Sequence, residues 1–186
     1  MKKLSTLIIA FTFITTTLIA QQKSINTENS KVVWKGYKVT GSHEGTIAIK
    51  SGTLSFENEL LTAGDFIIDM PTLTSTDLSG GGKDKLNNHL KSDDFFGVET
   101  HPTASLKFTN IKSSGKNSYE VTGDLTIKGK TNPTTFTLSI YGNKANASLK
   151  IDRTKFGVEY RSSNFFDNLK DKAIYDEFDL VADLQF

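Results

Sequence analysis

The chain has 186 residues, with 22 Lys and Arg side chains against 21 Asp and Glu, and a formal net charge of +1. This length fits one domain with a sizeable core, and the near balance of charge argues against nucleic acid as a partner, because phosphate binding needs a basic patch. The sequence contains no cysteine, so disulfides, thiol catalysis and a cysteine-linked lipid anchor are excluded.

The first segment has the plan of an export signal. Lys2 and Lys3 precede an apolar run from Leu4 to Ala20, which ends in a small residue. Residues 1–20 are therefore predicted to be a cleaved signal peptide. A membrane anchor is the alternative, but the threonines in the run make it polar for a membrane span. We expect a periplasmic or secreted protein with no stable membrane span after cleavage.

The next segments separate an irregular start from a long series of strands. Residues 21–30 are polar and show no periodic pattern, so they are predicted to be a flexible N-terminal arm. From Lys31 onward, apolar side chains recur with a period of two, which is typical of strands. Ser51 and Gly52 predict a turn within this series. The same alternation returns after residue 103 and continues to the C-terminus, so residues 31–186 are predicted to form one domain.

One stretch interrupts the strands with a helical pattern. Leu86 and Leu90 are four residues apart, so a short helix over residues 83–91 would place both on one face. Phe95 and Phe96 follow as an apolar pair. We interpret this stretch as a helical cap on one end of a sheet.

Strands that each show one apolar face describe an antiparallel sheet with one dry side and one wet side. Closing such a sheet removes its exposed edges. The predicted fold is therefore all-β: a single antiparallel up-and-down β-barrel of about eight strands, with a short helical insertion capping one end. The pattern leaves open whether the interior is filled or hollow, and whether Gly80–Gly82 form a hinge or a plain linker.

Three blocks of the sequence resemble the YceI family. They are the run from His89 to Phe96 with Val98, Glu99, His101 and Pro102, the run from Gly123 to Thr131, and the run from Arg153 to Val158. The resemblance implies a YceI-like domain over residues 31–186, with a lipocalin-like barrel of an exported bacterial protein that holds an isoprenoid or similar amphipathic lipid. The family often carries Arg-Asp where this chain has Leu86 and Asn87, so a headgroup contact by that arginine cannot be carried over.

Aromatic content is skewed, with 13 Phe against one Trp. These rings either pack an ordinary core or line a smooth apolar interior. With the resemblance, we expect a ligand pocket, in which His89 either bonds a polar headgroup or fixes the turn that follows it. The side chains expected to line the pocket are Trp34, Phe66, Leu86, His89, Leu90, Phe95, Phe96, Phe108, Phe136 and Phe156.

Catalytic motifs give little support to an enzyme. His43, His89 and His101 show no metal-ligand spacing, and no G-x-S-x-G motif is present. We expect a lipid-binding protein without catalytic residues, metal or cofactor, whose partner is an isoprenoid or other amphipathic lipid. The alternative is a metal-dependent or acid–base hydrolase at the barrel mouth that uses one of these histidines. The identity of the lipid and the oligomeric state are left open.

Overall fold

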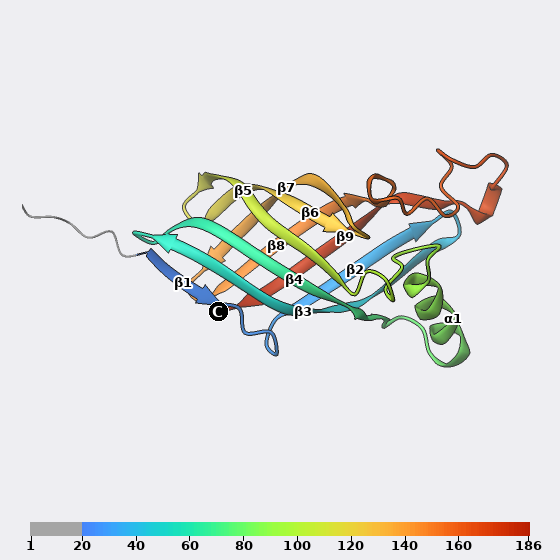
Figure 1. Cartoon of the computed structure of the whole chain (residues 1–186), viewed down its shortest axis with the longest axis horizontal. Coiled ribbons are helices and arrows are strands. Elements are labelled where there is room, and N and C mark those ends of the chain that lie inside the picture. The colour runs from blue at the N-terminus through green and yellow to red at the C-terminus, as the bar shows by residue number, and fades with distance from the viewer. Residues whose placement is uncertain (1–19) are drawn as a thin grey trace, which may run out of the picture.

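The structure is a computed structural model that describes residues 20–186 (Figure 1). The predicted signal peptide lies outside these residues except for Ala20. No helix in residues 20–186 is long and apolar enough to cross a membrane. The elements are β1 (Ala20–Ser24), β2 (Lys31–Lys38), β3 (Gly41–Glu57), β4 (Leu60–Ser75), α1 (Gly80–Lys91), β5 (Thr103–Gly115), β6 (Ser118–Ile127), β7 (Lys130–Tyr141), β8 (Lys144–Asp152), η1 (Arg153–Phe156), η2 (Lys170–Lys172) and β9 (Ile174–Gln185).

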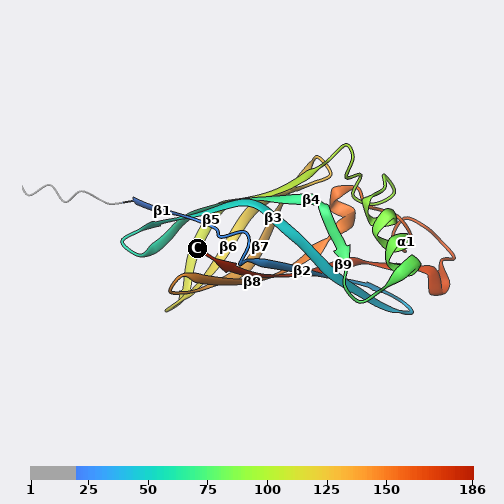
Figure 2. The same cartoon turned by 90° about the horizontal axis from the view of Figure 1, so that it is seen from below.

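Strands β2 to β9 form a closed antiparallel barrel. Each strand pairs with its neighbour in the sequence, β9 pairs with β2, and β3 pairs with β4, so the sheet closes on itself. The views in Figures 1 and 2 place α1 across one end of this barrel. The predicted all-β, up-and-down barrel with a helical cap is confirmed.

The alternation of side chains explains why these segments are strands. In β8, Ala145, Ala147, Leu149 and Ile151 are buried, and the residues between them face water. One face of each such strand packs into the barrel interior while the other stays solvated.

Two local features differ from the sequence prediction. Ser51 and Gly52 form no turn. Strand β3 runs through both residues, and its pairing register with β4 shifts near them, as at a β-bulge. A Cβ on Gly52 would lie 2.8 Å from a ring carbon of Phe66, so the glycine leaves room for that ring. Gly80–Gly82 form the first turn of α1, so they are part of the cap itself.

The segment 21–30, predicted as a flexible arm, is held against the barrel. Residues 20–24 form β1, which pairs with the second half of β3, where β2 leaves the edge free. Ile25 is buried, and the backbone N–H of Asn26 donates to the carbonyl of Gln185 at 2.7 Å. The side chains of β1 are mostly exposed, so main-chain hydrogen bonds hold it. Such a strand leaves no apolar pattern in the sequence.

Candidate ligand-binding pocket

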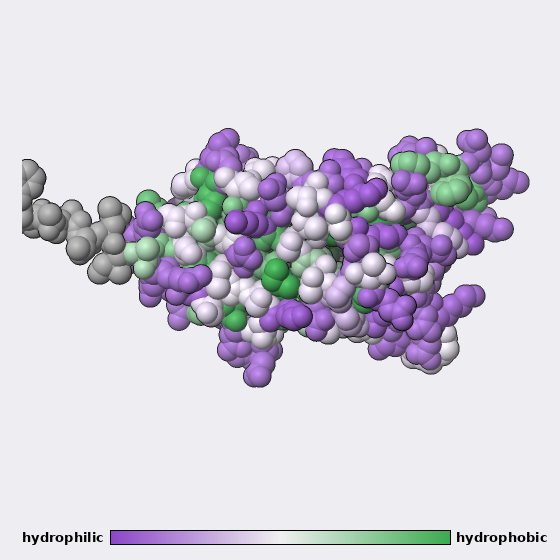
Figure 3. All heavy atoms as spheres, in the orientation of Figure 1, coloured by the Kyte–Doolittle hydropathy of each residue, from purple (hydrophilic) through white to green (hydrophobic). Residues whose placement is uncertain are grey.

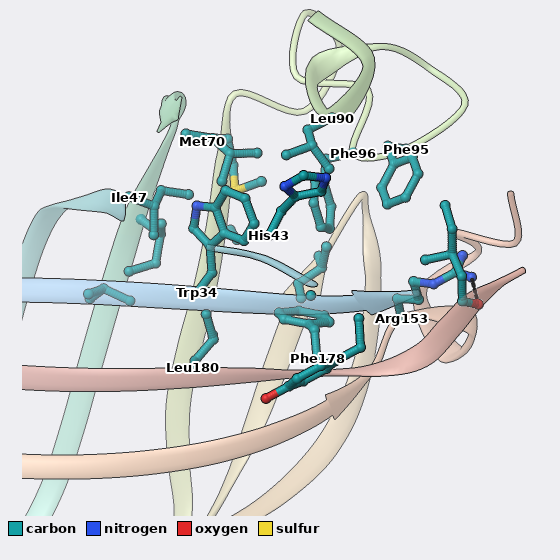
Figure 4. A pocket seen from close by; sticks show the side chains of 18 of the residues that line it. Trp34, His43, Ile47, Met70, Leu90, Phe95, Phe96, Arg153, Phe178 and Leu180 are labelled. Carbon is teal, nitrogen blue, oxygen red and sulfur yellow. Dashed lines mark hydrogen bonds between the residues drawn. The ribbon is translucent and has the colours of Figure 1, made fainter. Parts of the chain in front are cut away.

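A pocket of about 180 Å³ lies at the end of the barrel that α1 covers. Its walls come from β2, β3, β4 and β9, with contributions from β5 and β6, and its roof comes from α1 and the loop after it (Figure 4). Most of the lining side chains are aliphatic or aromatic. Five residues predicted from the sequence lie in this lining: Trp34, Leu86, Leu90, Phe95 and Phe96.

The end of α1 aims the two phenylalanines at the barrel. The helix stops at Ser92, whose backbone N–H and hydroxyl both bond the carbonyl of His89. The backbone N–H of Phe95 then donates to Ser92 at 3.0 Å, and that of Phe96 donates to Leu90 at 3.2 Å. These turns fold the chain back under the helix, so both rings reach the pocket.

A side-chain amide fastens the helix to the barrel wall. Asn87 accepts a hydrogen bond from the backbone N–H of Ser75 at 2.8 Å and donates to the hydroxyl of Thr74 at 3.1 Å. Both partners lie in β4. Leu86, the preceding residue, lines the pocket with an apolar side chain.

The interior next to the pocket is filled by phenylalanines. The ring centroids of Phe66 and Phe108 lie 5.8 Å apart, and those of Phe108 and Phe136 also lie 5.8 Å apart. None of these three residues, which we call the phenylalanine layer, belongs to the pocket lining. The sequence placed them in the pocket because a period of two tells which side chains point inward, without telling their height in the barrel.

Two more predicted residues lie outside the lining. Phe156 is only 2% exposed and packs in the core from η1. His89 packs edge-on against Tyr160 and Phe95, with ring centroids 4.5 and 5.1 Å apart. Burial lowers the pKa of His89, Asp94 opposes this shift, and Arg161 adds to it. The ring of His89 therefore lies beside the turn that follows it and outside the pocket lining.

A buried arginine holds the wall of the pocket together. Arg153 is 3% exposed and donates to the carbonyls of Val158, Ile174 and Tyr175 at 2.6, 3.0 and 3.1 Å. It also lies 3.2 Å from Asp176. Burial lowers the pKa of Arg153, and the nearby carboxylates oppose the shift. The guanidinium thereby joins η1 to the start of β9, which supplies part of the lining.

His43 is a lining residue that was not predicted from the sequence. Its imidazole lines the pocket, and its Nδ1 lies 2.8 Å from Asp77. Burial raises the pKa of Asp77, but hydrogen bonds from His43, Ser75 and a backbone N–H outweigh it, so the pKa is lowered. The available signal was the spacing of four residues between His43 and Ile47, which places both side chains on the inner face of the same strand.

The hydroxyl of Ser75 is not paired with the imidazole of His43. The hydroxyl of Ser75 donates to Asp77 at 2.8 Å, and its partner is this carboxylate rather than His43. Within residues 20–186, no three His, Cys, Asp or Glu side chains are grouped as metal ligands would be.

The exterior around this end is mostly polar. Figure 3 shows hydrophilic residues over much of one face, with an apolar patch at the loop between η1 and β9. Phe165 and Phe166 lie in this loop and are about half exposed, at 51% and 50%.

The closed antiparallel barrel, with an apolar pocket under a helical cap, places this protein in the class of lipocalin-like barrel proteins. Residues 24–186 match the model of the YceI-like domain, so the chain belongs to this family, as predicted.

Relatives in several bacteria agree with this assignment. A UPF0312 protein of Azotobacter vinelandii is 34% identical over 89 residues, which cover 48% of this chain and 44% of that protein. Protein YceI of Escherichia coli is 33% identical over 98 residues, covering 53% and 49%. The chain thus spans about half the length of these relatives.

Solved structures share the fold at low sequence identity. BcnA of Burkholderia cenocepacia is 23% identical with a TM-score of 0.66, covering 86% of this chain and 98% of that one. A polyisoprenoid binding domain from Saccharophagus degradans is 13% identical with a TM-score of 0.58, covering 90% and 97%. These likenesses concern the barrel itself.

Proposed function

We propose that this protein is an exported lipid-binding protein that holds a long apolar or amphipathic lipid, of polyisoprenoid type, for carriage, storage or protection. The observation that carries the proposal is the apolar pocket between α1 and the barrel wall. Membership of the YceI-like family and the polyisoprenoid-binding domain of similar fold support the same ligand class. The signal-like plan of residues 1–20 supports export.

Binding in such a pocket is driven by desolvation. Each methylene taken from water contributes about 0.8 kcal/mol, so a hydrocarbon tail binds with few polar contacts. The cavity of about 180 Å³ is smaller than the roughly 300–1,000 Å³ that is usual for small-molecule sites. One part of a long tail therefore fills the pocket. The rest of the tail either displaces the phenylalanine layer or lies at the mouth of the pocket.

Native mass spectrometry of the protein purified from its own host tests the proposal. We expect a lipid-sized adduct on the full chain. Phe96→Ala removes a ring from the lining and should lose most of the adduct, with a smaller effect on the melting temperature. Phe165→Ala removes an exposed ring outside the lining and should retain it. Protein without any adduct, or equal retention by a folded Phe96→Ala variant, contradicts the proposal.

The alternative of a hydrolase rests on the His43–Asp77 pair at the pocket. Because Ser75 bonds Asp77 instead of His43, the pair has no serine to activate there, and we favour binding. Metal analysis and ester hydrolysis on the same sample separate the two functions. Stoichiometric zinc, or turnover that His43→Gln abolishes, would favour the hydrolase.

A further inference from the structure

One end of the barrel carries a group of exposed apolar side chains. Phe165, Phe166 and Tyr175 are each at least half exposed, and so is Val39 in the turn between β2 and β3. The backbone N–H of Val39 donates to the carbonyl of Ala173 at 3.2 Å, so this turn lies against the start of β9. We call these four exposed side chains the apolar tip. A group of exposed apolar side chains commonly marks a site of interaction.

An ordered turn keeps the two phenylalanines at the surface. The backbone N–H groups of Phe165 and Phe166 donate to the carbonyl of Ser162 at 3.1 and 3.0 Å, and Ser162 is fully buried. The side-chain amide of Asn164 donates to the carboxylate of Asp176 in β9 at 2.7 Å. These bonds fasten the loop to the barrel, so the exposure of both rings is part of the fold.

The apolar tip borders the least enclosed part of the pocket. Tyr175 belongs to the lining and is its most exposed member among the residues that the structure describes. The pairing of β2 with β9 is irregular here, because Gly36 pairs with Phe178 whereas Lys38 pairs with Ile174. Gly36 also lines the pocket, and a Cβ on it would meet no other atom within 4 Å. The pocket therefore has open space where β2 ends and β9 begins, beside the tip.

The shape of this end suits a soft surface. In Figures 1 and 2 the loop between η1 and β9 projects beyond the end of the barrel, at the end where α1 lies, while β1 lies at the opposite end. The apolar patch of Figure 3 lies at this loop. A projecting tip can sink into a bilayer, whereas a protein segment commonly binds along a groove or a sheet edge.

Charge around the apolar tip is balanced. The loop between η1 and β9 carries as many cations as acids, namely Arg161, Lys170 and Lys172 with Glu159, Asp167 and Asp171. An anionic partner would therefore gain little from this surface. Aromatic rings beside long cationic side chains instead suit the region of lipid headgroups, where the rings reach the acyl chains and the cations stay in water.

We propose that the apolar tip docks on the surface of a lipid bilayer, with Phe165 and Phe166 entering the acyl region, so that the pocket exchanges its ligand directly with the membrane. This inference rests on the proposed function and deepens it by making a membrane surface the donor and acceptor of the lipid. A pocket mouth that faces the bilayer spares the hydrocarbon tail a passage through water, which costs about 0.8 kcal/mol for each methylene.

Flotation of the purified protein with phosphatidylcholine vesicles tests the docking. The wild type should float with the vesicles, and the double variant Phe165→Ser/Phe166→Ser should bind about 10-fold more weakly. Leu60→Ser/Tyr141→Ser is the matched control, because it removes two equally exposed apolar side chains from turns at the opposite end and should bind like the wild type. Since the charges of the loop balance, adding phosphatidylglycerol should change binding by less than about 3-fold.

A second measurement connects docking with ligand exchange. Transfer of a fluorescent farnesol analogue from vesicles to the delipidated protein should be about 10-fold slower for Phe165→Ser/Phe166→Ser, with the same final occupancy, because neither ring belongs to the pocket lining. Calorimetric titration with farnesol in solution should give the same affinity for this variant and the wild type.

The outcomes separate this inference from the proposed function. Absence of flotation by the wild type, or equal flotation of the phenylalanine variant, overturns the docking while leaving lipid binding in solution intact. Flotation that requires phosphatidylglycerol and disappears at high salt replaces the rings with charge and also overturns it. Self-association of the wild type that the phenylalanine variant abolishes would make the tip an interface between copies of the chain, against the proposal. Failure of farnesol to bind in solution overturns the proposed function together with the exchange step.

Discussion

The guanidinium of Arg153 lies 3.2 Å from the carboxylate of Asp176, at the point where β9 begins. Three backbone carbonyls share the same guanidinium. Arg153→Met leaves these acceptors and the carboxylate without their donor, so we expect a loss of about 3–5 kcal/mol in the free energy of unfolding. Urea denaturation followed by circular dichroism measures it.

Arg161→Met provides the matched control, because this arginine is exposed and stacks on Tyr160. Its substitution should change stability by less than about 1 kcal/mol. Arg153→Lys keeps the charge but cannot reach four acceptors from one nitrogen, so it should resemble Arg153→Met. A midpoint of denaturation equal to that of the wild type would refute the bridging role of Arg153.

The packing of His89 predicts a dependence of stability on pH. Burial lowers the pKa of His89 in the folded protein, with Asp94 opposing and Arg161 adding to the shift. The unfolded chain then binds a proton more readily, so stability should fall as the pH drops below about 6.5 and level off below the folded pKa. His89→Phe keeps a ring beside Tyr160 and should flatten this part of the profile.

Urea midpoints measured between about pH 8 and pH 5 provide the comparison. If His89→Phe shows the same slope as the wild type, the pH dependence arises elsewhere in the chain.

The architecture of this protein could be predicted from the sequence more fully than the details of its pocket. Alternation identified strands such as β8, and the spacing of Leu86 and Leu90 identified the cap. By contrast, β1 is bound by its backbone, so its polar side chains gave no signal. Periodicity also shows whether a side chain points into the barrel, but it does not show where along the barrel axis that side chain lies. It could not tell that Phe96 lines the pocket while Phe136 fills the interior beside it.

Long-range pairing was equally hidden. His43 takes its orientation from Asp77, which lies 34 residues away, and the antiparallel pairing of β3 with β4 brings them together. Short motifs do not report such pairs, because the partners meet only once the strands are in register.

The phenylalanine layer predicts which tail lengths the barrel accepts. Phe136→Leu shortens the side chain that packs edge-on against Phe108, which should extend the cavity toward the middle of the barrel at a cost below about 3 kcal/mol. Under the proposed function, binding should shift toward geranylgeraniol relative to farnesol, as measured by calorimetric titration. Phe56→Leu makes the same change in the ring pair with Phe186 and should leave the ratio unchanged. An unchanged ratio for Phe136→Leu would place the tail outside this path.

The position of β1 on the edge of β3 predicts that β1 prevents the barrel from associating with another chain through this edge. Strands β2 to β9 close without β1, so a chain that begins at Ile25 should still fold. It would expose the β3 edge from Thr53 to Glu57, which β1 covers, and an open edge is a template for pairing with another chain. We expect concentration-dependent dimers or larger species in light scattering coupled to size exclusion, whereas a chain that begins at Ala20 stays monomeric over the same range. Adding Ser55→Lys to the shortened chain places a charge on the edge and should restore the monomer. Identical elution of the two unsubstituted chains at every concentration would show that β1 does not protect this edge.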